Sequence, residues 1–152
     1  MSVAVSIAVQ REAFDVGAEY AQLRQHNCAD GATAMFTGSV RDLNMAQSVS
    51  CLELEHYPGM TEKVLREIAG QAAGRWQLGR VRIVHRFGRL HPGEDIVFVG
   101  STAPHRQAAL DACAFMMDFL KTRAPFWKKE SGPEGEHWVA ARQSDLKALD
   151  KW

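Results

Sequence analysis

The chain has 152 residues, of which 46% are apolar and 24% are charged, so its composition is that of a globular protein and not of a disordered or fibrous one. Eighteen basic and eighteen acidic residues cancel, which argues against a polycation that coats nucleic acid. The length is that of one domain, and residues 1–152 are expected to fold as a single unit.

The predicted elements alternate between strands and helices. In chain order they begin with a strand over 3–9, a helix over 16–26 capped by Asp15, a strand over 32–40, a polar loop over 41–47, a strand over 48–57 and a helix over 61–73. They continue with a strand over 80–87, a turn over 91–95, a strand over 95–102, a helix over 105–122, an extended segment over 126–130, a turn over 131–135, a strand over 137–140 and a helix over 144–149. Because strands and helices mix without strict βαβ order, the sequence predicts an α+β fold.

Neither export nor membrane insertion is predicted. No apolar run approaches the roughly 18 residues that span a bilayer, and the N-terminal apolar residues alternate as in a strand. The three cysteines, Cys28, Cys51 and Cys113, are odd in number and far apart, which favours reduced thiols over a disulfide framework. We therefore expect a cytoplasmic protein without membrane contact.

Positive charge is concentrated in one stretch of the sequence. Residues 80–129 carry nine basic and four acidic residues, a net charge of +5, whereas the stretches on either side are negative. Such a block can hold an anion, although a solvated basic face would have the same composition. A nucleic-acid-binding module is an alternative, but only Phe126 and Trp127 would provide stacking surfaces among these basic residues.

Two lysines flank the end of the long predicted helix. Pro125 disfavours helix at Ala124, so the helix must end there, with Lys121 in its last turn. Lys128 follows on the extended segment, and the two ammonium groups can lie close together across the bend. Such a pair suits phosphate binding, proton transfer or an acyl-lysine intermediate.

Side chains alternate along the segment after this proline. Phe126, Lys128 and Glu130 are therefore expected on one face, and Trp127 and Lys129 on the other.

Three further residues are candidates for anion binding. Arg41 follows the end of a predicted strand, a common place for a binding loop. His105 and Arg106 lie at a predicted helix start, where free backbone N–H groups favour an anion. With Lys121 and Lys128 they form the candidate anion site, but their spacing does not show that they converge.

Motifs for other chemistries are absent. The sequence has no phosphate-binding glycine loop, no dinucleotide fingerprint, no nucleophile elbow and no Cys or His pair at metal-ligand spacing. Cys51 and Cys113 occupy apolar positions and are expected in the core. The sequence therefore offers no recognised motif for these chemistries.

From about residue 14 to Trp152 the chain resembles the large (catalytic) subunit of molybdopterin synthase. The matching stretches, in the order of that family, are Phe36–Arg41, Leu54–Glu62, His85–Gly88, Pro92–Gly100, His105–Arg106 and Asp118–Glu130. The last stretch is the most specific, because an unrelated protein would rarely share so long a run.

The resemblance implies an α/β hammerhead fold with an additional antiparallel β-sheet, working as a homodimer. Each subunit would bind a small ubiquitin-like sulfur-carrier protein, giving a heterotetramer. The Gly-Gly end of the carrier, as a thiocarboxylate, would deliver sulfur to cyclic pyranopterin monophosphate and form the dithiolene of molybdopterin. The enzyme itself would need no metal or cofactor.

The family's functional residues match positions of this sequence. Lys121 would lie beside the thiocarboxylate, and Lys128 would contact substrate or move protons. Arg41, His105 and Arg106 match residues around the pterin and its phosphate, some of which reach across the dimer interface.

Four further matching positions would flank the same pocket, namely Ser39, Val40, Lys129 and Glu130. Ser39 stands where some relatives have a basic residue, so phosphate binding would depend more on Arg41. A non-catalytic scaffold that binds the carrier is the alternative, and the presence of both Lys121 and Lys128 argues against it.

Overall fold

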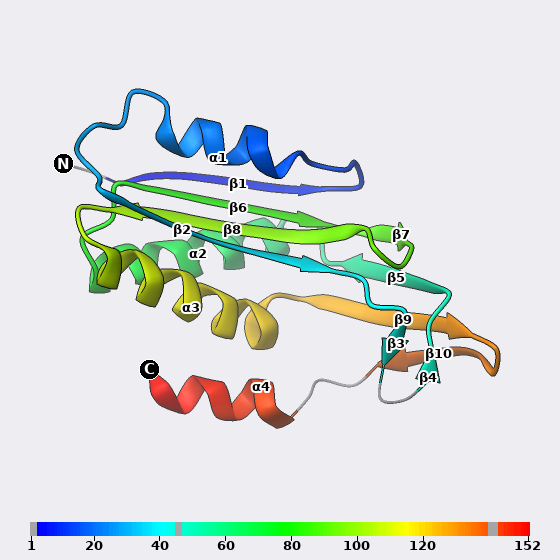
Figure 1. Cartoon of the computed structure of the whole chain (residues 1–152). Coiled ribbons are helices and arrows are strands. Elements are labelled where there is room, and N and C mark those ends of the chain that lie inside the picture. Colours follow the sequence, from blue (N-terminus) through cyan, green and yellow to red (C-terminus); the bar gives the residue numbers. More distant parts are fainter. Residues whose placement is uncertain (1–2, 45–46, 140–142) are drawn as a thin grey trace.

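Figure 1 shows the computed structural model of the chain, which describes residues 3–44, 47–139 and 143–152. Its first sheet has four strands in the order β1-β6-β8-β2. These strands are β1 (Ala4–Gln10), β6 (Arg80–Arg86), β8 (Asp95–Ala103) and β2 (Ala32–Ser39). The β1–β6 pair is parallel, and the other neighbours are antiparallel.

Helices cover both faces of this sheet (Figure 1). Helix α1 (Val16–Arg24) lies on one face, and α2 (Met60–Arg75) and α3 (Arg106–Arg123) lie on the other. The main core fills the space between the sheet and the α2–α3 pair, with fully buried side chains from each layer such as Leu65, Ile83 and Met116. The long helices therefore form by burying one apolar face each.

The second sheet is antiparallel throughout, in the order β10-β9-β5-β7. Its strands are β10 (Gly135–Val139), β9 (Phe126–Gly132), β5 (Cys51–His56) and β7 (Gly88–Leu90). The remaining elements are the strand pair β3 (Leu43–Asn44) and β4 (Gln47–Ser48), helix α4 (Gln143–Ala148) and the 3₁₀ turn η1 (Leu149–Lys151). The predicted α+β class and the additional antiparallel sheet are both confirmed.

Local signals set several element ends as predicted. The Asp15 carboxylate accepts a hydrogen bond from the Ala18 N–H at 2.9 Å and caps α1. Helix α3 ends at Arg123, and Ala124 is extended (φ −68°, ψ 129°) because it precedes Pro125. The chain then runs directly into β9, so this proline connects a helix on the first sheet to a strand of the second.

The predicted helix over 16–26 and loop over 41–47 are both partly wrong. Helix α1 ends at Arg24, because Gln25 is extended and His26 has a positive φ of 55°. The polar segment contains strands β3 and β4 instead of an irregular loop, although residues 45–46 lie outside the described part. The strand predicted over 48–57 begins only at Cys51, since Ser48 pairs within β4.

Glycines explain two other differences between the predicted and the observed elements. Strand β6 ends at Arg86, and Gly88 (φ 92°) turns the chain into the second sheet, where it forms the unpredicted strand β7. The turn predicted over 131–135 is shorter, because β9 continues to Gly132 and pairs there with Gly135 (φ 96°). Residue 140, the predicted end of the last strand, lies outside the described residues.

The three cysteines are free thiols, with Cys51 and Cys113 buried as predicted. Burial raises the pKa of the Cys113 thiol to about 11, so this thiol stays protonated near neutral pH. Over the described ranges, the helices include none with the length and apolar character to cross a bilayer.

Candidate functional site

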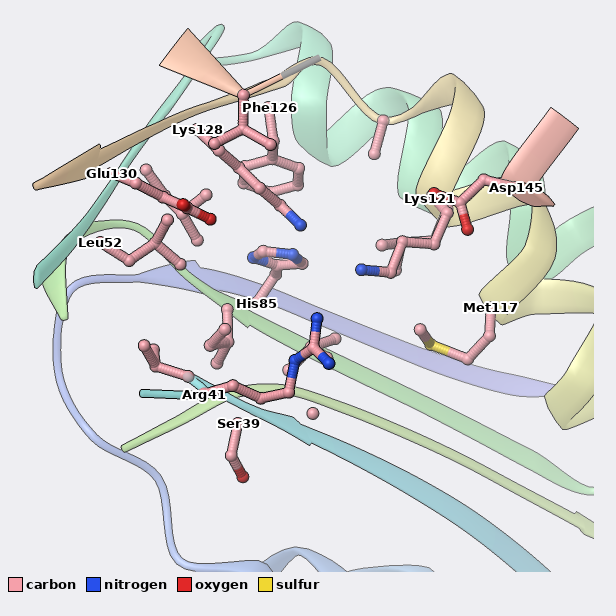
Figure 2. Close-up of a pocket in the computed structure, with 18 of the residues that line it drawn as sticks. Ser39, Arg41, Leu52, His85, Met117, Lys121, Phe126, Lys128, Glu130 and Asp145 are labelled. Atoms are coloured by element: carbon pink, nitrogen blue, oxygen red, sulfur yellow. The ribbon is translucent and has the colours of Figure 1, made fainter. Parts of the chain in front are cut away.

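A cavity of about 470 Å³ lies where the two sheets meet the C-terminal end of α3. Three cationic side chains from different elements line it: Arg41 after β2, Lys121 on α3 and Lys128 on β9. Figure 2 shows their nitrogen atoms turned toward the same space. The structure thus brings together three of the five residues of the candidate anion site.

The lysine pair is placed by the bend that the sequence predicts. Lys121 lies in the last turn of α3, and the chain passes through Pro125 directly into β9 (Figure 1). On β9, alternation turns Phe126, Lys128 and Glu130 into the cavity, which confirms the predicted face. Strand β9 is held beside β5, where Lys128 pairs with Leu54.

Arg41 reaches the cavity because the end of β2 is irregular. The register of β2 against β8 shifts between Gly38 and Ser39. The next residue, Val40, is buried, and its backbone N–H donates to the Glu94 carbonyl at 2.9 Å. This anchor fixes the backbone from which the Arg41 side chain extends into the cavity (Figure 2).

A buried histidine lies in the middle of the site. The His85 ring on β6 is 6% exposed and stacks on Phe126, with ring centroids 3.8 Å apart and planes 18° from parallel. Burial lowers the pKa of His85 to about 3, the Arg86 backbone hydrogen bond opposes this, and the charges of Lys128 and Lys121 lower the pKa further. The imidazole is therefore neutral at pH 7.

Three of the four flanking residues named from the sequence also line the cavity, namely Ser39, Val40 and Glu130. The Ser39 hydroxyl donates to the Asp95 carboxylate at 2.8 Å, and Figure 2 shows Ser39 at the margin of the cavity. Glu130 is buried, and its carboxylate lies 3.6 Å from Nε2 of His137. The side chains of Ser39 and Glu130 therefore border the cationic centre and have partners of their own.

Lys129 lies outside the cavity, on the other face of β9. Its ammonium lies 3.9 Å from the Glu53 carboxylate and 3.5 Å from that of Glu136, and 5.5 Å from the ring centre of Trp138. This position follows the predicted alternation along β9. The resemblance implied that Lys129 flanks the pocket, but Lys129 is not among the described residues that line it.

His105 and Arg106 are exposed at the opposite end of α3 from Lys121. A rise of about 1.5 Å per residue separates the ends of this 18-residue helix by about 25 Å. One chain by itself therefore does not bring these two residues to the cavity.

Two titratable residues that line the cavity, His85 and Asp145, were not among the site residues predicted from the sequence. His85 had a signal, because it is a polar residue at an inward position of a buried strand, but an isolated histidine of this kind is more often structural. Asp145 on α4 had no signal in the sequence, because its approach to the Lys121 side of the cavity depends on how the C-terminal helix folds back (Figure 2).

The arrangement suits the binding of anions. Arginine can hold a phosphate or carboxylate with two parallel hydrogen bonds, and the lysines can stabilise negative charge that develops during a reaction. None of the three cysteines lines the cavity, so a sulfur atom that reacts there would have to arrive with a ligand. Among the described residues, no group of three or more His, Cys, Asp and Glu side chains could hold a metal ion.

Comparison with known proteins gives consistent matches over nearly the whole chain. Residues 9–123 match the family described as "MoaE protein". The chain is 55% identical to the molybdopterin synthase catalytic subunit of Escherichia coli (strain K12) over 146 residues, which cover 96% of this chain and 97% of that one.

Solved structures agree with these sequence matches. The molybdopterin biosynthesis MoaE protein from Burkholderia ambifaria MC40-6 superposes with a TM-score of 0.84 at 53% identity, covering 97% of both chains. Molybdopterin synthase from Staphylococcus aureus superposes with a TM-score of 0.80 at 30% identity, covering 88% of this chain and 96% of that one. The chain therefore belongs to the MoaE protein family.

Proposed function

We propose that this chain is the catalytic subunit of a molybdopterin synthase. It transfers sulfur from the C-terminal thiocarboxylate of a small ubiquitin-like carrier protein to cyclic pyranopterin monophosphate and so forms the dithiolene of molybdopterin. The observation that carries this proposal is the convergence of Arg41, Lys121 and Lys128 on one cavity in a chain of this family. The substrate phosphate and the carrier's thiocarboxylate are both anions, and these three cations complement them.

In this proposal each cation has the role that the family resemblance implies. Lys121, at the end of α3, holds the thiocarboxylate end of the carrier, and Lys128 contacts the pterin substrate and transfers protons. Arg41 holds the phosphate. The Ser39 hydroxyl is less suited to this role, because it already donates its hydrogen bond to the Asp95 carboxylate. The sulfur nucleophile comes from the carrier, which is consistent with a cavity that no cysteine lines.

His105 and Arg106 fit this proposal only through a second copy of the chain. In the proposed homodimer, the exposed start of α3 of one subunit supplies these two side chains to the cavity of the other. Two carriers then complete a heterotetramer. We place the reaction in the cytoplasm, where the three free thiols stay reduced.

The test uses the purified protein, thiocarboxylated carrier and cyclic pyranopterin monophosphate, with molybdopterin measured as its oxidised fluorescent derivative. Lys121→Ala should fold normally and bind the carrier, but form molybdopterin at least about 100-fold more slowly, since a positioned proton donor or charge contributes that much. Lys63→Ala, an exposed helical lysine outside the cavity, is the matched control and should keep its activity. Unchanged product formation by Lys121→Ala would favour a non-catalytic scaffold that only binds the carrier.

A further inference from the structure

We infer that His85 is a substrate-binding residue of this site, whose Nε2 accepts a hydrogen bond from an N–H group of the pterin ring. The inference rests on the proposed function and adds a recognition element that the cationic residues do not supply. It follows from the tautomer of the ring, its place in the cavity and the chemistry of its neighbours.

The hydrogen bonding of His85 fixes its tautomer. Nδ1 lies 2.8 Å from the backbone carbonyl oxygen of Arg86. Because a carbonyl oxygen can only accept, Nδ1 carries the proton and donates it. The neutral ring then has its lone pair on Nε2, and among the described residues the Nδ1 bond is the single hydrogen bond of this side chain.

The ring is held rigidly where a ligand would lie. It is stacked on Phe126, and the His56 ring also lies near Phe126, with ring centroids 6.1 Å apart. His85 lines the cavity, and Figure 2 shows its ring between Lys128 and Arg41, with Lys121 beside them. A side chain fixed by stacking and by a backbone hydrogen bond loses little entropy when a ligand binds.

The acceptor complements a part of the substrate that the cations do not recognise. Arg41, Lys121 and Lys128 are donors, so they match the phosphate and thiocarboxylate oxygens. A reduced pterin also carries N–H groups, which lose their hydrogen bonds to water when they enter a cavity. A neutral imidazole in the centre accepts such a bond without placing a negative charge among the cations.

Two substitutions separate this role from a structural one. His85→Asn keeps an N–H that can donate to the Arg86 carbonyl but has no atom at the position of Nε2. His85→Gln has an amide oxygen that reaches that position and restores an acceptor. His26→Asn is the matched control, because His26 is exposed and has a φ of 55°, which asparagine tolerates.

The KM for the pterin substrate, the KM for the carrier and kcat are measured for each protein. His85→Asn should raise the KM for the pterin about 3- to 10-fold, as expected for one neutral hydrogen bond, with the KM for the carrier unchanged. His85→Gln should recover most of this loss. An unchanged pterin KM in His85→Asn, an equal change in the carrier KM, or no recovery in His85→Gln would each overturn the inference.

A second measurement needs no variant. In wild-type protein labelled with ¹⁵N-histidine, pterin binding should move the Nε2 resonance of His85 upfield, and an unmoved resonance would overturn the inference. Failure of the proposed function is seen separately: wild-type protein that binds the pterin but forms no molybdopterin would refute the reaction, while the Nε2 resonance would still decide the role of His85.

Discussion

Acidification should destabilise this protein in part through the buried His85. Its pKa in the folded state is about 3, against an ordinary value of 6.5, chiefly because burial disfavours the charged ring. As the pH falls below 6.5, the unfolded chain binds a proton at this position and the folded chain does not. Stability due to the neutral ring is therefore present above pH 6.5 and is lost progressively until the pH approaches 3.

The size of this loss follows from the two pKa values. Each pH unit between them costs about 1.4 kcal/mol, so lowering the pH from about 7.5 to about 5 should remove about 2 kcal/mol of stability through His85 alone. That is a substantial fraction of the roughly 5–15 kcal/mol by which a domain is usually stable.

The free energy of unfolding is measured by urea denaturation at both pH values, with the fluorescence of the four tryptophans as the signal. The reference protein is His85→Gln, which has no titrating group at this position in either state. Subtracting the pH dependence of one protein's free energy of unfolding from that of the other cancels the contributions of the other titrating groups. Both proteins are measured at the same concentration, so that association affects them equally. Parallel pH dependences for the two proteins would refute a neutral, buried His85.

Other substitutions test the rest of the site and the fold. Lys128→Ala should reduce molybdopterin formation far more than Lys129→Ala, because Lys129 lies between Glu53 and Glu136 outside the cavity. Equal losses of the fluorescent molybdopterin derivative in the two variants would contradict this geometry. Leu54→Ala should cost about 2–5 kcal/mol in urea denaturation, since this side chain is 1% exposed, whereas Leu110→Ala, 58% exposed, should change stability by less than about 0.5 kcal/mol. Asp15→Ala should cost about 1 kcal/mol through loss of the α1 cap and Asp15→Asn much less; equal losses would show that the cap does not stabilise the helix.

Local sequence determined most elements of this protein and the faces of several of them. Pro125 ends α3 because it restricts the residue before it, and alternation after it puts Lys128 in the cavity and Lys129 outside. Both effects act within a few residues, so they can be derived without knowing what packs against the segment. Strand β7 was missed for the converse reason: Gly88 changes the direction of the chain, and nothing nearby shows which sheet the next residues join.

Only the tertiary structure decided which side chains share a site. Periodicity relates a side chain to its own helix or strand, but the neighbours of that element depend on pairings between residues far apart, such as Leu54 with Lys128. These pairings bring Arg41 and Lys121 to the same cavity and leave Arg106 at the far end of α3. They also enclose His85 and thereby hold it in its neutral form, a property that depends on burial and on nearby charges and so cannot be inferred from the strand that carries it.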